Sequence, residues 1–364
     1  MKKSKPATLQ MIANELGVTV TTVSCILNNK GGTYAEATRQ KVLETAAKFK
    51  YRPNVLAHGM RGGKTHSAGV MIRNQGYFLN RVINGIHDTL LNHQTLMLLA
   101  WNDRNHHQLD WNPEVEKLIV HHLLDRRVDG FILCSSSENF DQCYVSEILE
   151  RHVPLVLVDR ELKSLNADFI GTDNVVGGEV AARHLLDLGH RQLLCCSLQQ
   201  CSNAVARQEA FDRMVGDCAG ATTQTLDFFG EDFHEVLAGI LKNPETRPTG
   251  IFCINDYVAL RVLEIAKELE LSAPRDFSII GFGDQRFAEP AAMNLSTFDQ
   301  YPYAIGEAAA HAYLRHVRAK VAHTTPRILR IDPKFLDKGS TGPVPKKAAR
   351  KQKKLCAQDA ITAP

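Results

Sequence analysis

The amino-acid sequence predicts a small all-α helix-turn-helix domain followed by a two-lobed α/β domain with parallel sheets. Residues 8–52 show three short amphipathic helices, and residues 67–335 alternate short apolar runs with amphipathic helical stretches. Such alternation implies parallel sheets covered by helices on both faces. Because this region of roughly 270 residues is long for one such sheet, we expect two lobes within a chain of 364 residues.

The first domain begins with two short helices joined at a glycine. Thr8 can cap the first helix, Gly17 is a natural corner, and Thr19 can cap the second. A third helix is expected from about residue 35 to residue 49. Two helices that meet at a glycine and are braced by a third form the helix-turn-helix plan, which places one helix in the major groove of DNA.

Charge supports DNA binding over the alternative, a small helical bundle that only docks onto the rest of the chain. Residues 1–66 hold 11 Lys and Arg against 3 Asp and Glu, a net charge of +8, whereas the whole chain carries +3. Residues 67–337 carry −11 and residues 338–364 carry +6. A basic head on an acidic body is typical of a protein that binds DNA through the head.

The C-terminal segment 336–364 is rich in Pro, Gly and Lys and has no apolar periodicity, so we predict a basic disordered tail. Two uses of this tail remain open, a solvated end and an additional non-specific DNA contact. The tail lacks the leucine heptads that a tetramerising segment would need.

The body shows short apolar strands separated by helical patterns. The predicted strands are 68–72, 95–100, 130–134, 155–158, 169–171, 192–197, 250–254 and 278–282. The predicted helices are 81–91, 114–126, 177–188, 207–215, 234–241 and 257–269. In open parallel sheets ligands bind outside the carboxyl ends of the strands, so two facing lobes would form a ligand site between them.

Composition argues against a membrane protein, an exported protein and a metalloprotein. We find no apolar run of about 20 residues and no signal peptide, so we expect a cytoplasmic protein that spans no membrane. The nine cysteines show no regular spacing and no CxxC pair, which favours buried thiols in a reducing compartment. A metal site formed by Cys196, Cys201 and His190 is the disfavoured alternative, and we expect no metal and no cofactor.

The head and the body both resemble the LacI/GalR family of bacterial repressors. The segments AxxLGVTVTTVSCILN and ATRQKVLETAAKFKYRPN follow the family pattern IAxxAGVSxxTVSRVLN…TRxxVxxAAxxLgYxPN in register. Further landmarks are RRVDGFIL, PLVLVDR, GTDNVVGGEVAARHLLDLGHRQL, AVARQEAF, PTGIFCIND, FSIIGFGD and LSTFDQYPYAIGEAAA. The resemblance spans about residues 8–335 and implies a periplasmic-binding-protein-like body.

The resemblance also implies boundaries. The expected parts are a helix-turn-helix domain 1–52, a hinge helix or linker 53–66, an effector-binding and dimerisation domain 67–335 with an N-lobe (67–163 plus 297–335) and a C-lobe (166–294), and the tail 336–364.

The DNA readers of the family map onto three residues of the second helix. Val20, Thr21 and Cys25 cannot make the bidentate contacts that read guanine or adenine, so we expect weak direct readout with a bias toward A·T base pairs. In the hinge, Met60 could act as the minor-groove wedge, although Gly59 costs about 1 kcal/mol of helix stability and a plain flexible linker is the alternative. The residues expected to contact DNA are Thr8, Thr19, Val20, Thr21, Thr22, Ser24, Cys25, Asn28, Thr38, Tyr51, Asn54, Ala57, His58, Met60 and Arg61.

The resemblance implies an effector site in the body. Arg207 would offer paired donors to the effector, and Asp159 would accept protons from its hydroxyls. Asn255 is favoured as a ligand contact over a helix cap, whereas Asp173 and Asn174 are favoured as cap residues. The expected effector contacts are Tyr77, Phe78, Asp159, Arg207, Phe228, Asn255 and Asp284.

One motif departs from the family. The usual GFDD is GFGD here, so Gly283 removes a carboxylate that commonly binds the effector. We therefore hypothesise that a larger, phosphorylated or acidic ligand suits the site better than a standard hexose.

Together these features predict a homodimeric transcription regulator, a repressor whose affinity for double-stranded operator DNA depends on a small molecule, a sugar or sugar derivative. A cytoplasmic small-molecule binding protein is the first alternative, but it leaves the basic head unexplained. A nucleotide- or sugar-dependent enzyme is the second. We find no G-x-G-x-x-G after the first strand, no P-loop and no nucleophile–base set, so we expect no enzyme.

Overall fold

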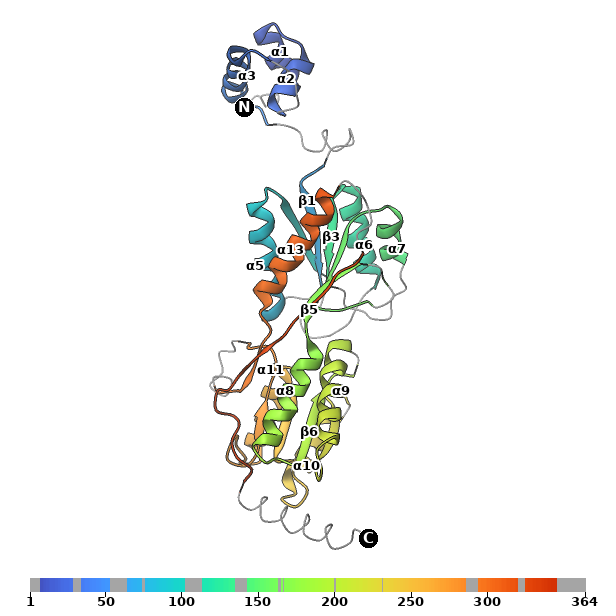
Figure 1. Ribbon diagram of the computed structural model, residues 1–364, viewed down its shortest axis with the longest axis vertical. Coiled ribbons are helices and arrows are strands. Elements are labelled where there is room, and N and C mark those ends of the chain that lie inside the picture. The colour runs from blue at the N-terminus through green and yellow to red at the C-terminus, as the bar shows by residue number, and fades with distance from the viewer. Residues whose placement is uncertain are drawn as a thin grey trace. The chain divides into compact units, whose positions relative to one another are not determined.

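The computed structural model describes residues 7–28, 34–52, 64–73, 76–101, 113–134, 143–162, 165, 167–199, 201–230, 232–285, 294–319 and 325–345. The chain divides into two compact units, Met1–Thr65 and His66–Pro364 (Figure 1). The first unit is the helical head and the second is the α/β body, so the predicted fold class is confirmed.

The head has the three predicted helices, α1 (Leu9–Leu16), α2 (Val20–Leu27) and α3 (Glu36–Lys48). The Thr8 hydroxyl accepts a hydrogen bond from the backbone N–H of Met11, and the Thr19 hydroxyl accepts one from Thr22. Gly17 ends α1 with a φ of 65°, a left-handed conformation that glycine adopts without strain. The buried core of the head consists of Ile12, Ala13, Val23, Ile26, Val42 and Ala46.

No single helix in the described ranges is long and apolar enough to cross a membrane. The pair α1 and α2, bent by 112°, reaches the required length and composition only when both helices are counted together.

The N-lobe is built on a six-stranded parallel sheet in the order β11-β5-β4-β3-β1-β2. Its strands are β1 (Ser67–Ile72), β2 (Leu96–Trp101), β3 (Gly130–Leu133), β4 (Leu155–Val158), β5 (Asp168–Thr172) and β11 (Ile328–Ile331). One core lies between the sheet and helices α5 (Tyr77–Asn92) and α13 (Pro302–Arg318). A second core lies between the sheet and helices α6 (Pro113–Asp125) and α7 (Cys143–Glu150). The sheet is therefore covered on both faces.

The C-lobe has a four-stranded parallel sheet in the order β7-β6-β8-β9. Its strands are β6 (Gln192–Ser197), β7 (Thr222–Asp227), β8 (Gly250–Cys253) and β9 (Ser278–Ile280). Four helices pack with this sheet around one core: α8 (Asn174–Asp187), α9 (Ser202–Gly216), α10 (Phe233–Lys242) and α11 (Asp256–Glu268). An antiparallel pair, β10 (Thr297–Asp299) and β12 (Lys334–Leu336), adds Phe298 and Phe335 to the same core.

The lobe boundaries differ from the predicted ones at three strands. β5 was expected in the C-lobe, yet it pairs with β4 and β11 in the N-lobe sheet. Strands β10 and β12 were expected in the N-lobe, yet they contribute to the C-lobe core. For β5 the physical reason is that all five of its residues are buried. A short buried run does not reveal which of the two sheets the strand joins.

The first part of the predicted disordered tail is ordered against the C-lobe, which corrects the expectation for residues 336–345. The backbone N–H of Ile279 donates to the Ser340 carbonyl at 3.0 Å, and that of Val344 donates to the Leu188 carbonyl at 3.2 Å. These bonds pair backbone groups of the edge strand β9 and of the end of α8 with backbone groups of the tail. Because backbone hydrogen bonds do not depend on side-chain type, the composition of the tail could not reveal them. Residues 346–364 lie outside the described residues.

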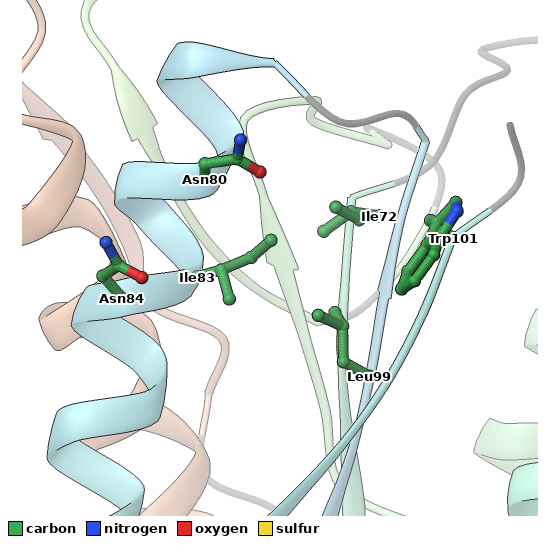
Figure 2. A pocket seen from close by; sticks show the side chains of 6 residues that line it. All are labelled: Ile72, Asn80, Ile83, Asn84, Leu99 and Trp101. Atoms are coloured by element: carbon green, nitrogen blue, oxygen red, sulfur yellow. The ribbon is translucent and has the colours of Figure 1, made fainter. Parts of the chain in front are cut away.

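A pocket with a volume of about 210 Å³ lies in the N-lobe beside the edge strand β2 (Figure 2). Figure 2 shows that α5 contributes two asparagines to it and that β1 and β2 contribute apolar side chains. Its lining residues are Ile72, Asn80, Ile83, Asn84, Leu99 and Trp101. None of the expected effector contacts lines this pocket.

Candidate DNA interface and effector site

Helix α2 presents a polar face away from the core of the head. Val23 and Ile26 are buried, whereas Thr21 is exposed and Ser24 and Cys25 are half-buried. The side chain of Val20 packs against the head core, so it is only partly available for a base contact. Thr21, Ser24 and Cys25 are therefore the accessible side chains on the face that would enter a major groove.

Several other expected DNA contacts also have local structural roles. The Asn28 amide donates to the Ser24 carbonyl at 2.7 Å and closes the last turn of α2. The hydroxyl of Thr22 lies 2.9 Å from that of Thr19 at the helix start. Tyr51 packs against the head core, and Thr38 in α3 is half-buried. The hinge residues expected to contact DNA lie outside the described residues; they are Asn54, Ala57, His58, Met60 and Arg61.

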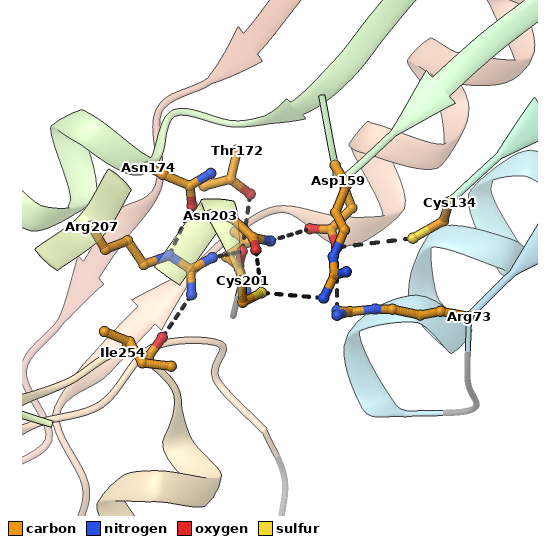
Figure 3. Close-up of polar contacts among 11 residues, drawn as sticks. Arg73, Cys134, Asp159, Thr172, Asn174, Cys201, Asn203, Arg207 and Ile254 are labelled. Atoms are coloured by element: carbon orange, nitrogen blue, oxygen red, sulfur yellow. Dashed lines mark hydrogen bonds and ion pairs between the residues drawn. The ribbon is translucent and has the colours of Figure 1, made fainter. Parts of the chain in front are cut away.

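Polar side chains from both lobes meet where the parallel strands end (Figure 3). Arg73 follows β1, Cys134 follows β3, and Asp159 and Arg160 follow β4. From the C-lobe, the first residues of α9 and the residue after β8 approach them; these are Cys201, Asn203, Arg207 and Ile254. This is the place where the sequence predicts the effector site, and it includes the expected contacts Asp159 and Arg207.

Arg207 is the centre of the C-lobe side of this site. Its Nε donates to Asn174 Oδ1 at 2.8 Å, its Nη1 to the Ile254 carbonyl at 2.6 Å and its Nη2 to Gln300 Oε1 at 3.1 Å. The guanidinium carbon lies 3.7 Å from the centre of the Phe282 ring. Burial lowers the pKa of Arg207 to about 10, against the opposing effect of Asp159, so the group remains charged at neutral pH.

Asp159 is the centre of the N-lobe side. Its Oδ1 accepts from the Asn203 amide of the C-lobe at 3.2 Å, and its Oδ2 accepts from Arg73 Nη2 at 3.3 Å. Burial acts to lower the pKa of Arg73, but Asp159 together with the Cys134 and Cys201 thiols outweighs it, and the pKa of Arg73 is raised. Asp159 has a φ of 66°, unusual for a residue other than glycine, and such strain is common at ligand sites.

Five expected effector contacts lie outside this cluster. Phe78 is a buried residue of the N-lobe core, which corrects its assignment to the site, and the Tyr77 hydroxyl accepts a hydrogen bond from Arg81 at 3.3 Å. Phe228 packs edge-on against Phe233 in the C-lobe.

The last two of these contacts have structural partners. Asn255 Oδ1 accepts from the Val258 N–H at 2.8 Å, so Asn255 caps α11 and the disfavoured cap reading describes it better. Asp284 pairs with Lys338 at 2.5 Å, on a segment that sequence reasoning treated as disordered.

The sequence missed several members of the cluster. Arg73, Arg160, Cys201, Asn203 and Gln300 come from four separate segments and share no motif. Gln300 Oε1 accepts from both Arg207 and Thr172, so it ties the N-lobe strand β5 to the C-lobe helix α9. Position was a signal for Arg73 and Arg160, which follow predicted strands, whereas Gln300 lies in the landmark LSTFDQYPYAIGEAAA and follows a strand that was not predicted.

A buried carboxylate next to the cluster makes stability depend on pH. Asp256 is 1% exposed, and it accepts hydrogen bonds from the Thr297 hydroxyl at 2.5 Å and the Gln285 N–H at 2.7 Å. Burial raises its pKa from 3.8 to about 6, against the opposing effect of the two hydrogen bonds. The stability that the protonated carboxyl contributes is thus fully present below pH 3.8 and is lost as the pH rises through 6.

We predict that Asp256→Asn, which cannot ionise, gains stability relative to the wild type as the pH rises from 4 toward 7. The difference in the free energy of unfolding between the variant and the wild type should change by up to about 1.4 kcal/mol per pH unit. Urea unfolding at several pH values measures it, with Asp217→Asn at the exposed end of α9 as the control. A difference that stays constant between pH 4 and pH 7 would contradict the assignment.

A helix-turn-helix head joined to two parallel-sheet lobes that meet at the carboxyl ends of their strands defines a ligand-responsive DNA-binding regulator. Comparisons with known proteins agree. Residues 8–54 match the model for bacterial regulatory proteins of the lacI family, and residues 182–341 match the periplasmic binding protein-like domain. The head thus matches the DNA-binding domain of the lacI family and the body a periplasmic binding protein-like domain, and the curated relatives are transcription regulators rather than enzymes.

Two curated relatives illustrate the likeness. The HTH-type transcriptional repressor PurR of Vibrio atlanticus (strain LGP32) is 27% identical, with 86% of this chain and 93% of that protein covered. The HTH-type transcriptional regulator DegA of Bacillus subtilis (strain 168) is 28% identical, with 80% of this chain and 86% of that protein covered.

Solved structures show the same fold. The lac repressor dimer bound to operator and the anti-inducer ONPF matches with a TM-score of 0.74 at 20% identity, covering 93% of this chain and 100% of that chain. The complex of the regulator CelR with cellobiose matches with a TM-score of 0.64 at 20% identity, covering 92% of this chain and 99% of that chain.

Proposed function

We propose that this protein is a cytoplasmic, homodimeric repressor that binds a two-half-site operator through α2 and responds to a small molecule between its lobes. The net charge of +8 on residues 1–66 supports attraction to DNA phosphates, and the polar face of α2 supports base contacts. A dimer follows from the geometry by which two helix-turn-helix heads bind two half-sites. PurR, a relative over most of the chain, is named a repressor.

The proposed effector is a sugar or sugar derivative. Arg207 offers a planar fork of donors, and Asp159 and Asn203 offer an acceptor and an amide close by, which together suit a molecule with several hydroxyls. The CelR–cellobiose complex shares this fold and supports a sugar-like ligand.

The observation that carries the proposal is the position of Gln300. This buried amide bridges Arg207 of the C-lobe and Thr172 of the N-lobe, so a ligand that engages Arg207 acts directly on a segment that crosses between the lobes. A ligand that binds one arrangement of the lobes better than another shifts the equilibrium between them. The changed lobe geometry would alter the dimer and the spacing of the two heads.

The test is to select genomic DNA fragments with the purified full chain and to measure binding by gel shift at several salt concentrations. We expect one short operator with two half-sites and an affinity that falls steeply with salt. Binding without sequence preference, or none at low salt, would overturn the proposal. Sugars that bind the chain should then change the operator affinity.

We predict that Cys25→Arg changes the preferred operator. The half-buried Cys25 thiol suits a thymine methyl, whereas arginine forms bidentate bonds with guanine, so selected half-sites should gain a G at one position. Each such contact discriminates by roughly 1–3 kcal/mol. Repeating the fragment selection measures the change, and Lys41→Arg in α3 is the control because it keeps the charge outside α2. An unchanged selected sequence would refute the placement of Cys25 at a base pair.

A further inference from the structure

The last described residues of the chain form a strap along the C-lobe, which we define as residues 337–345. Ser340 Oγ donates to the Ile279 carbonyl at 2.6 Å, and the Gly342 N–H donates to Ser278 Oγ at 3.0 Å. Together with the backbone bonds described above, these contacts hold the strap along its length. The chain that follows the strap therefore starts from a fixed point on the C-lobe.

The strap ends on the side of the C-lobe that faces away from the candidate effector site. The bond from the Val344 N–H to the Leu188 carbonyl lies just before the start of β6, whereas Arg207 bonds at the carboxyl end of β8. The chain from the head enters the body at Ser67, the amino end of β1, whose carboxyl end also faces the site. Figure 1 shows both sheets between these two points. Since β1 and β6 have six residues each, about 40 Å of sheet separates the two ends of the body.

The sequence beyond the strap is strongly basic. Residues 346–354 read KKAARKQKK, which is six Lys and Arg in nine residues without an acidic residue. Asp359 is the only acidic residue in 346–364, so this segment carries a net charge of +5. Lys338 of the strap is not part of this charge, because it pairs with Asp284 at 2.5 Å. The positive charge beyond the strap is therefore concentrated in residues 346–354, which we call the basic run.

A polyanion with closely spaced charges suits the basic run. Six cations in nine residues give about one charge per 5 Å of extended chain, and double-stranded DNA carries one negative charge per about 1.7 Å of its axis. Residues 67–337 are the competing anion on the same chain, but their net charge of −11 is distributed over a whole folded body. DNA also releases condensed counterions when its phosphates are neutralised. The charge density of the partner therefore favours DNA.

The reach of the basic run determines which DNA it can bind. Its nine residues span at most about 32 Å from the end of the strap. This length is shorter than the sheets that lie between the strap and the entry of the chain at Ser67. We therefore expect the basic run to contact DNA at the end of the body that is remote from the head's linker.

We propose that the basic run binds the phosphates of a second DNA segment without sequence preference, so that the protein holds its operator through the head and another duplex through residues 346–354. The proposal rests on the operator binding proposed above, which supplies the first DNA segment. A protein bound at its operator would thus raise the local concentration of distant DNA near that operator.

The test is a bridging assay with the full chain. A duplex just long enough for the two half-sites is fixed to beads and loaded with protein, and capture of a labelled duplex without an operator is then measured at increasing salt. We expect the full chain to capture roughly tenfold more of this duplex at low salt than a chain that ends at Pro345. The logarithm of the affinity should fall against the logarithm of the salt concentration with a slope of roughly −5 for six phosphate contacts.

Variants of the full chain separate the charge of the basic run from its other properties. Replacing its six cations with glutamine should reduce capture to that of the shortened chain, and restoring charge as arginine at the five lysine positions should rescue it. Lys242→Gln combined with Lys267→Gln is the control, because these exposed lysines belong to α10 and α11 of the body. This control should capture the second duplex as the wild type does.

Equal capture by the full and shortened chains, or capture that persists in the glutamine variant, would overturn the proposal. The absence of capture by the full chain would also overturn it, provided that a gel shift shows normal binding to the short operator duplex. Loss of that gel shift in the wild type would instead reject the proposed function. In that case, direct binding of the operator-free duplex to the full and shortened chains still decides the role of the basic run.

Discussion

Replacing Gly178 with alanine is expected to cost the C-lobe about 3 kcal/mol of stability and to displace Arg207. Gly178 lies in α8 where that helix crosses α9, and an added Cβ would lie 2.2 Å from the Arg207 carbonyl oxygen and 3.0 Å from the Ala210 Cβ. The atom it meets first is backbone, so no side chain can rotate away and the two helices must separate. The change should appear as a lower thermal midpoint.

The effect should reach the site because the same two helices carry its residues. Asn174 begins α8 and accepts from the Arg207 Nε at 2.8 Å, so separating α8 from α9 lengthens this bond. We therefore expect Gly178→Ala to weaken the response of operator binding to effector as well as the fold. A variant with an unchanged thermal midpoint would show that the helices do not pack this closely.

Gly239→Ala is the matched control. Gly239 lies within α10, is exposed, and an added Cβ there meets nothing within 4 Å. Alanine in an open helical position stabilises by about 0.5–1 kcal/mol, since it reduces the freedom of the unfolded chain. Both substitutions replace glycine with alanine inside a helix. If one lowers the thermal midpoint and the other raises it, the close packing of α8 against α9, and not helix propensity, decides the change in stability.

The sequence predicted those parts of the fold that have a strong periodic signal. Apolar runs such as residues 130–133 and 250–253 lie in fully buried strands, where the pattern and the environment agree. Strand β7, Thr-Thr-Gln-Thr-Leu-Asp, was missed because it is the half-exposed edge of its sheet and needs few apolar residues. Strand β11 was missed for the same reason, since it forms the outer edge of the N-lobe sheet.

The site was only half predictable because its contacts join distant segments. Arg207 and Asp159 were found through the family motifs, and both lie at the lobe interface. Arg73 pairs with a carboxylate 86 residues away, and Gln300 meets an arginine 93 residues away. Such pairs depend on how the strands are ordered in the sheet, which local patterns do not encode. Asn255 was predicted as a ligand contact but caps α11, because an asparagine between a strand and a helix suits either role.

Arg207→Lys is expected to abolish the response to effector while operator binding persists. Lysine keeps the positive charge but replaces the planar fork by one ammonium group. That group cannot serve Asn174, Ile254 and Gln300 in their present directions, and it loses the flat contact with Phe282. Leaving a buried acceptor without its donor costs about 1–3 kcal/mol, so the thermal midpoint should also fall.

The measurement is a gel shift on the selected operator, with and without the sugar that binds the wild-type chain most tightly. Arg183→Lys, on the exposed face of α8, is the control. If Arg207 carries the signal through Gln300, the variant should bind the operator whether or not the sugar is present. If Arg207 only supports the C-lobe, the variant should be less stable yet still respond. Since the head is a compact unit separate from the body, operator binding alone cannot decide between these cases. The change in operator affinity that the ligand causes is the quantity that decides.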